Sequence, residues 1–320
     1  MKYGLILANR GVVYGLITTE ELIQMAEIAD QSDLFQSVWV GDSLLGKPRL
    51  ESMVLLAAIA GRTKRVRIGP SCMASVTLRD PVLLAYQWAS LDLIAQGRTI
   101  LMGCTGIVEQ EGGRREGELY GVSNRDRAER LEEWIVLLRR LWTEDSVTFE
   151  GKHYRCRDIT VAPRPAAQPH PPLWIASNPV GSPERVKRAL RRVVEYADGW
   201  QTTTFSPRMP ELVATQREIF TELGRDYDAF ETCLYHNINV NEDRETARQE
   251  AKQFLDEYYM TNFSWEMVDR WTATGSPEEC VEQLRQYQAY GFKEVAIRCA
   301  GPDQFGQLKR VMEEVLPRLQ

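Results

Sequence analysis

Histidine is scarce in this chain of 320 residues, which contains only His153, His170 and His236. Hydrolases that depend on a metal ion usually gather histidines and carboxylates at neighbouring strand ends. Three histidines scattered along the sequence argue against that class, and no metal site is predicted. His236 lies in an apolar stretch, where a histidine packed in the core is the favoured interpretation.

Paired cysteines, long apolar runs and an excess of basic residues are also absent. The six cysteines show no CxxC spacing, so we expect reduced thiols and neither a zinc site nor a disulfide framework. No stretch approaches the roughly 18 apolar residues that a membrane helix needs, and no signal peptide is recognisable, which predicts a cytoplasmic protein. Lys and Arg total 39 against 45 Asp and Glu, and this net charge of −6 argues against nucleic acid or a membrane as the partner.

The sequence does contain a repeated alternation of short apolar runs with longer amphipathic stretches, which is typical of βα units. Eight strands are expected, at Tyr3–Ala8, Ser37–Val40, Val66–Ser71, Thr99–Gly103, Leu173–Ala176, Gly199–Thr202, Cys233–Val240 and Glu294–Arg298. Helices are expected at Glu20–Asp30, Ser52–Gly61, Val82–Ala95, Arg125–Trp142, Glu184–Tyr196, Pro210–Leu223, Asp243–Tyr258, Glu278–Ala289 and Asp303–Leu316.

This rhythm predicts an α/β fold, a (β/α)8 TIM barrel with insertions. It spans residues 1–320 as a single domain, with insertions near 107–123, 149–172 and 259–274. The main rival is a doubly wound open sheet, which would typically show a glycine-rich phosphate turn after its first strand. Residues Ala8–Gly11 form no such turn, so the barrel is favoured.

Several sequence blocks, in this order, carry a resemblance to a known family. They are Ser37–Ser43, Arg65–Gly69 with Arg79–Pro81, Leu91–Arg98, Phe149–Tyr154, Pro172–Ala176 with Ala197–Trp200, and Thr274–Glu278. Over nearly its full length the chain resembles the luciferase-like monooxygenase superfamily. The resemblance implies a luciferase-like (β/α)8 barrel that holds reduced FMN or the deazaflavin coenzyme F-420 at its C-terminal mouth.

Two segments are expected to hold the cofactor. The resemblance implies a non-prolyl cis peptide between Ser71 and Cys72, whose bulge would support one face of the flavin ring. The loop that contains Ala176, Ser177, Asn178, Gly181 and Ser182 joins a strand to a helix, and helix N-termini are natural phosphate sites. The competing interpretation is a simple Ser182 helix cap, and Thr203 at the next strand end is either a further hydroxyl donor or a strand residue.

The expected catalytic residues are Asp42 and Asn237. Asp42 ends the second strand and would orient substrate or a ring nitrogen, or else cap the following turn. Asn237 shares one face of the seventh strand with Tyr235 and Asn239, where a flavin edge is a possible partner near the mouth. The family branch that oxidises sugar phosphates has a His after this Asp and a Glu after the fourth strand. Ser43 and Ile107 stand there, which argues against sugar-phosphate dehydrogenation.

Three functions stay open at this point. The favoured one is an FMN-dependent monooxygenase acting on a small organic substrate and supplied with reduced flavin by a separate flavin reductase, because no nicotinamide fingerprint is visible. The alternative is a coenzyme F-420-dependent hydride-transfer reductase or dehydrogenase. The second alternative is a non-catalytic flavin-binding barrel. Family habit suggests a homo-oligomer.

Overall fold

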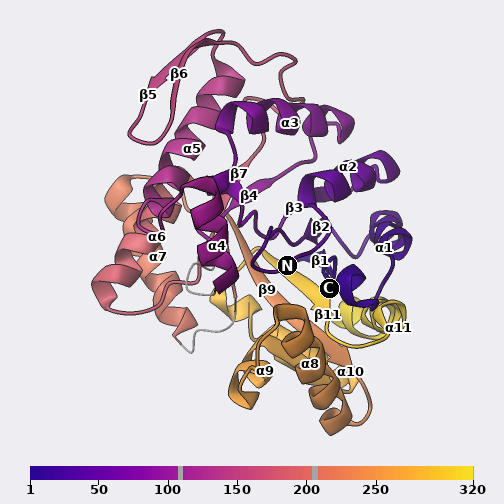
Figure 1. Ribbon diagram of the computed structural model, residues 1–320. Coiled ribbons are helices and arrows are strands. Elements are labelled where there is room, and N and C mark those ends of the chain that lie inside the picture. Colours follow the sequence, from indigo (N-terminus) through magenta and orange to yellow (C-terminus); the bar gives the residue numbers. More distant parts are fainter. Residues whose placement is uncertain (107–110, 204–207, 320) are drawn as a thin grey trace.

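The computed structural model describes residues 1–106, 111–203 and 208–319, and its centre is a closed parallel barrel (Figure 1). Its strands are β1 (Lys2–Leu7), β2 (Ser37–Val40), β3 (Arg67–Pro70), β4 (Leu101–Gly103), β7 (Leu173–Ala176), β8 (Gly199–Thr203), β9 (Glu231–Val240) and β11 (Glu294–Cys299). They lie in the order β3-β2-β1-β11-β9-β8-β7-β4. Parallel bridges from Ile68 to Thr99 and from Met73 to Gly103 join β3 to β4. The eight predicted strands and the TIM barrel are confirmed.

Helices surround the barrel (Figure 1). They are α1 (Thr19–Gln31), α2 (Ser52–Arg62), α3 (Pro81–Ile94), α5 (Arg127–Thr143), α6 (Pro183–Tyr196), α7 (Met209–Leu223), α8 (Arg244–Tyr259), α10 (Pro277–Arg285) and α11 (Gln304–Arg310). Short helical turns are η1 (Gly11–Tyr14), η2 (Val76–Leu78), η3 (Gln288–Tyr290), η4 (Val311–Val315) and η5 (Leu316–Leu319). Capping boxes formed by Thr18 with Glu21 and by Ser276 with Glu279 fix where α1 and α10 begin. None of the described helices is both long and apolar enough to cross a membrane.

The three predicted insertions contain the remaining elements. The first contains α4 (Glu111–Tyr120), and the second contains the antiparallel hairpin of β5 (Val147–Glu150) and β6 (Arg155–Ile159), which lies at the periphery in Figure 1. The third contains α9 (Trp265–Trp271), which leads into β10 (Thr272–Gly275). β8 pairs with the first half of β9, and β10 pairs with its second half, so β10 extends the barrel wall at the mouth.

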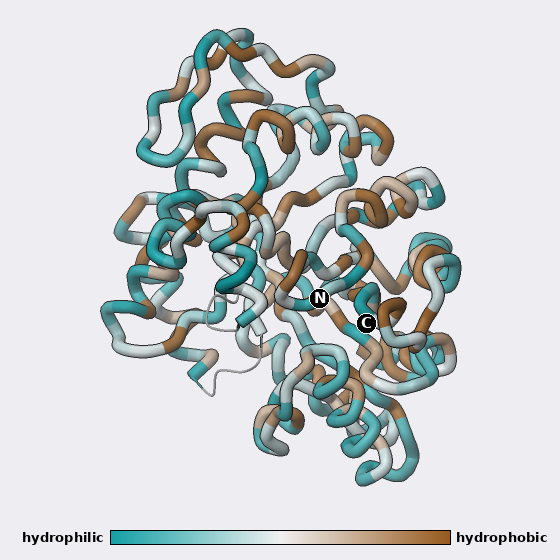
Figure 2. Tube along the Cα trace, viewed as in Figure 1, coloured by the Kyte–Doolittle hydropathy of each residue, from teal (hydrophilic) through white to brown (hydrophobic). Residues whose placement is uncertain are grey.

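Two hydrophobic layers hold the fold together, one between strands and helices and one inside the barrel. Figure 2 shows hydrophobic stretches on the strands and hydrophilic ones on the outer loops and helices. Inside the barrel the rings of Trp39 and Trp174 lie 5.6 Å apart. Beneath them Glu294, which is fully buried, accepts hydrogen bonds from Ser37 Oγ at 2.5 Å and Trp39 Nε1 at 3.1 Å. Glu294 with its hydrogen-bond partners and the two tryptophan rings fill this part of the barrel interior. A ligand can therefore enter only at the carboxyl ends of the strands.

Candidate active site at the barrel mouth

A cavity of about 420 Å³ opens at the carboxyl ends of the strands. Its wall includes residues that directly follow β2, β3, β4 and β7, together with the end of β8. Tyr259, the last residue of α8, and Trp271, the last residue of α9, complete the wall. A cavity of this size is in the range of small-molecule sites, and barrel enzymes place their chemistry at this end.

The peptide bond between Ser71 and Cys72 is cis, as the resemblance implied. Both residues line the cavity. Ser71 Oγ donates a hydrogen bond to Gln201 Oε1 at 2.6 Å, and Gln201 in turn donates to Cys233 Sγ at 3.4 Å. The bulge after β3 is thereby tied to β8 and β9 across the barrel interior.

One pair of cysteines departs from the expectation of reduced thiols. Cys72 and Cys104 form a disulfide, with their Cα atoms 6.1 Å apart. The two residues are 32 positions apart in sequence, so no local spacing indicates the pairing. They meet because β3 and β4 are neighbours where the barrel closes. The disulfide forms part of the cavity wall, and the other four cysteines are free.

The loop between β7 and α6 is organised by Asn178. Its Oδ1 atom accepts hydrogen bonds from Thr202 Oγ1 at 3.0 Å, from Thr203 N at 2.8 Å and from Thr203 Oγ1 at 3.1 Å. The remaining polar atom of the Asn178 side chain is therefore a donor, the amide nitrogen. Ala176, Ser177, Asn178 and Thr203 line the cavity.

The far end of this loop lies outside the main cavity. Gly181 lines an adjoining cavity of about 450 Å³, which shares Asn178, Thr202 and Thr203 with the main one. Ser182 lines neither cavity and caps α6, with its Oγ accepting from Arg185 N at 3.4 Å. Ser182 is therefore a helix cap in this structure, as the competing interpretation expected. A contact between Ser182 and the cofactor stays a prediction. Thr204 lies outside the described residues.

Asp42 lines the cavity, but its carboxylate is held by the protein. Oδ1 accepts from Ser52 Oγ at 2.7 Å and Oδ2 accepts from Ser75 N at 2.8 Å, while Arg79 lies 3.4 Å away. These contacts join the loop after β2 to the start of α2 and to the segment after the cis peptide. Asp42 thus holds the site's framework, and a direct role on substrate stays a prediction.

Asn237 is fully buried and does not line the main cavity. Its Nδ2 atom donates to Trp271 O at 3.0 Å, and its Oδ1 atom accepts from Arg298 Nε at 3.1 Å. Asn237 therefore fixes the position of the Arg298 guanidinium. Tyr235, on the same face of β9 as Asn237, lines the cavity, and a catalytic role for Asn237 stays a prediction.

The opposite face of β9 carries His236. Its ring packs edge-on against Tyr287 with centroids 4.9 Å apart, on the helix side of the sheet. Burial lowers the pKa of His236 to about 3. The residue is therefore a neutral core histidine at physiological pH, as the sequence favoured.

Sequence reasoning missed the basic and aromatic wall of the cavity. Lys47 and Arg49 line it from the loop after β2, and Tyr259 and Trp271 line it from the insertion after α8. Burial, followed by nearby arginines, lowers the pKa of Lys47 to about 8. The one available signal was the basic segment Gly46–Arg49 directly after a barrel strand, where loops build active sites.

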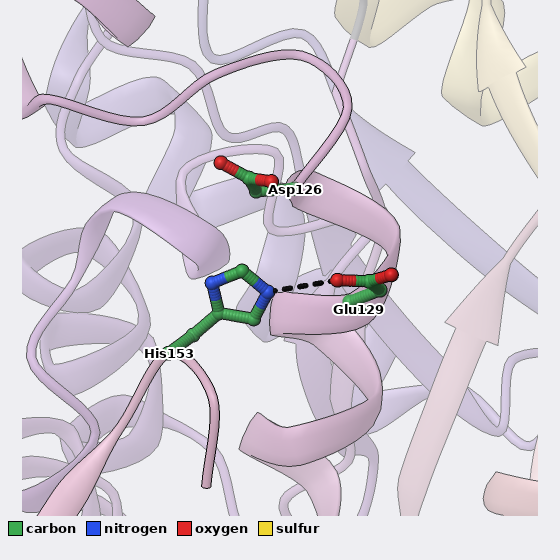
Figure 3. A group of neighbouring side chains, drawn as sticks. All are labelled: Asp126, Glu129 and His153. Atoms are coloured by element: carbon green, nitrogen blue, oxygen red, sulfur yellow. Dashed lines mark hydrogen bonds and ion pairs between the residues drawn. The ribbon is translucent and has the colours of Figure 1, made fainter.

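A second cluster of titratable residues lies away from the mouth. Asp126 and Glu129 at the start of α5 meet His153 of the hairpin (Figure 3). Glu129 Oε2 lies 3.0 Å from His153 Nε2 and 2.5 Å from Lys152 Nζ, so its carboxylate already has a cationic partner. This arrangement ties the hairpin to α5, and we assign no metal to it.

Comparison with known proteins indicates which family the chain belongs to. A model of the luciferase-like monooxygenase family matches residues 1–294. The F-420-dependent glucose-6-phosphate dehydrogenase of Intrasporangium calvum is 30% identical over 291 residues, which is 84% of each chain. The enzyme of the same name from Nakamurella multipartita is 29% identical over 327 aligned positions, covering 93% of this chain and 92% of its own.

Solved structures show the same fold. A monooxygenase of Streptomyces bottropensis superposes with a TM-score of 0.81 at 22% identity, covering 100% of both chains. An F-420-dependent secondary alcohol dehydrogenase superposes with a TM-score of 0.79 at 17% identity, covering 100% of this chain and 99% of its own. Together with the barrel and its cis bulge, these matches establish that the chain belongs to the luciferase-like monooxygenase family.

Proposed function

We propose that this protein is a coenzyme F-420-dependent oxidoreductase that transfers a hydride to or from a small organic substrate. The observation that carries the proposal is the 30% identity, over 84% of the chain, with a dehydrogenase that depends on this cofactor. This is the alternative of the sequence analysis, and it replaces monooxygenation as the leading function. The relatives named above, at 29% and 30% identity, are dehydrogenases that depend on this cofactor.

Two features of the cavities support a deazaflavin as the cofactor. Small side chains, those of Ser71, Ala74, Ala176 and Ser177, line the stretch between the cis bulge and the β7–α6 loop, which leaves room for a planar ring. The adjoining cavity along α6 continues from Asn178 and offers space for the cofactor's long polar tail. The N-terminus of α6 and the amide of Asn178 are donors suited to a phosphate.

When bound, the deazaflavin would donate or accept the hydride, and the protein's own residues would position the reactants. We assign support of the ring to the Ser71–Cys72 peptide, and the phosphate to the segment that begins with Ala176, Ser177 and Asn178, with Gly181, Ser182 and Thr203 near it. Asp42 would hold the bulge after β3 and the β2–α2 loop in fixed positions relative to each other. The wall of Tyr235, Tyr259 and Trp271 would exclude water from the substrate side.

The relatives' sugar substrate is not part of the proposal. Ser43 stands where the sugar-phosphate branch of the family has its histidine, and a serine hydroxyl cannot take up a proton near neutral pH as an imidazole does. Ile107, the other departure, lies outside the described residues.

The second candidate is an FMN-dependent monooxygenase. It is favoured by the structural likeness to the Streptomyces bottropensis monooxygenase, which at 22% identity speaks for the fold alone. This candidate also requires a separate reductase to supply reduced FMN, whereas the deazaflavin route does not.

Parallel titrations distinguish the two. Purified protein is titrated with oxidised F-420 and with oxidised and reduced FMN, following cofactor fluorescence and binding heat. The proposal expects micromolar or tighter binding of F-420, and FMN binding at least tenfold weaker. Preference for FMN would favour the second candidate, and millimolar or weaker binding of both would remove the cofactor assignment altogether.

A further inference from the structure

Two cationic side chains, Lys47 and Arg49, line one end of the cavity. Burial lowers the pKa of Lys47, and two more cations, Arg10 and Arg298, are close enough to lower it further. Lys47 and Arg49 lie in the β2–α2 loop, Arg10 follows β1, and Arg298 is on β11. Lys47 is 7% exposed, Arg10 is 6% exposed and Arg298 is 1% exposed. Lys47 and Arg298 both lie against the ring of Tyr259, at 4.7 and 5.1 Å, which places their charges close together.

None of these four cations forms a salt bridge with any described residue. Arg298 makes its hydrogen bonds to neutral atoms, the Oδ1 of Asn237 at 3.1 Å and the hydroxyl of Tyr259 at 3.3 Å. Its Nη2 atom is buried with no partner among the described residues, and so is Nε of Arg10. Buried charges are normally paired, because an unpaired one costs several kcal/mol.

The surrounding aromatic rings offset only part of that cost. Arg298 lies over the rings of Tyr258 at 4.2 Å and Tyr235 at 5.3 Å, and Arg49 over Tyr258 at 5.5 Å. A cation over a ring gains about 0.5–2 kcal/mol and keeps its net charge. The rings therefore position the cations without neutralising them.

The two acids on the cavity wall are occupied elsewhere. Glu116 Oε1 accepts hydrogen bonds from the backbone nitrogens of Leu44, Leu45 and Gly46, at 3.0, 2.6 and 2.8 Å. Asp42 is held by Ser52, Ser75 and Arg79, as described above. Neither comes within 4.0 Å of the Lys47 ammonium, so this end of the cavity keeps an excess of positive charge.

We propose that this end of the cavity, faced by Lys47 and Arg49, binds an anionic group, a carboxylate or a phosphate, carried by the substrate. The assignment of that anion to the substrate rests on the proposed function. The cofactor phosphate is assigned to the β7–α6 loop, and β7 lies three strands from β2 in one direction around the barrel and five in the other. An anion at Lys47 thus lies across the mouth from the phosphate loop, where the second reactant would enter.

The test uses the protein without cofactor and two probes, sulfate as a stand-in for a phosphate group and acetate for a carboxylate. Binding is measured by calorimetry at constant ionic strength for the wild type, Lys47→Gln, and the control Lys64→Gln, which removes an exposed lysine. Asn178→Asp is included to suppress anion binding at the β7–α6 loop. Thermal unfolding confirms that each variant folds. If Lys47→Gln does not fold, Arg49→Gln replaces it in the measurement.

We expect saturable binding of one probe that persists in Asn178→Asp, is unchanged in Lys64→Gln and is weakened about tenfold in Lys47→Gln, as for loss of one charge-assisted hydrogen bond. The tighter probe identifies the chemical class of the group. Equal affinity in Lys47→Gln and the wild type overturns the proposal, and so does absence of saturable binding by both probes. Because no cofactor is present, failure here leaves the F-420 titration untouched, and failure of that titration leaves the anion site standing.

Discussion

Replacing Asn178 with aspartate changes the charge of the proposed phosphate loop without changing its shape. In the wild type, one side-chain oxygen accepts three hydrogen bonds from Thr202 and Thr203, at 2.8–3.1 Å. A carboxylate oxygen accepts the same three bonds. The substitution therefore replaces an amide donor with a negative charge at a fixed position.

The effect on cofactor binding follows from this geometry. Two like charges about 5 Å apart repel by about 3 kcal/mol at an effective dielectric constant of about 20. Solvent at the open cavity and salt reduce the repulsion to roughly 1–2 kcal/mol, and loss of the amide hydrogen bond costs about 1 kcal/mol. The sum, roughly 2–3 kcal/mol, weakens the affinity for F-420 roughly 30- to 150-fold.

The assay is an F-420 fluorescence titration at two salt concentrations, with a smaller loss expected at high salt. Asn262→Asp is the matched control, because Asn262 is exposed and its Oδ1 atom already meets Lys252 Nζ at 2.8 Å. Equal F-420 affinities for Asn178→Asp and the wild type, with unchanged thermal unfolding, would refute the placement of the phosphate at this loop.

Three further predictions concern the stability of the scaffold. The pKa of His236 is about 3 in the folded protein and about 6.5 when unfolded, so its contribution is complete above pH 6.5 and is lost as the pH falls toward 3. The urea midpoint should thus fall less between pH 7.5 and 5 in His236→Phe than in the wild type, and equal falls would contradict this. Glu294→Gln removes the buried carboxylate that pairs with the partly exposed Arg67 at 3.3 Å, and because Arg67 keeps Glu231 at 3.5 Å it should cost about 1–2 kcal/mol in urea unfolding, whereas an unchanged midpoint would show that the pair is not stabilising. Gly69→Ala puts a Cβ 2.2 Å from the Ile100 carbonyl oxygen where the barrel closes and should lower Tm, whereas Gly61→Ala, which has open space, should not; equal Tm values would contradict that contact.

The barrel could be predicted because its signals are local. Each short apolar run and each amphipathic stretch is recognised from a few neighbouring residues. The strand β10 escaped prediction because Thr272–Gly275 is short and is defined by pairing with the second half of β9. Only the folded chain shows that β9 continues beyond the reach of β8.

In the same way, only those site residues that local signals indicate could be predicted from the sequence. The cis peptide at Ser71 and the loop at Asn178 follow strands directly, so resemblance and position in the repeat sufficed to find them. Arg298 is a single basic residue in an apolar strand, and most of the rings around it come from α8 and α9. Lys47 likewise becomes a site residue only when Tyr259, more than 200 positions away, packs against it. Contacts of such sequence separation leave no local pattern.

A crystal structure of the protein with F-420 tests the central claim most directly. We predict the deazaflavin ring in the cavity against the Ser71–Cys72 peptide, with the phosphate within hydrogen-bond distance of Asn178 and the Lys47 end open to a second molecule. A ring bound outside this cavity, or a cofactor phosphate held by Lys47 and Arg49, would contradict the account.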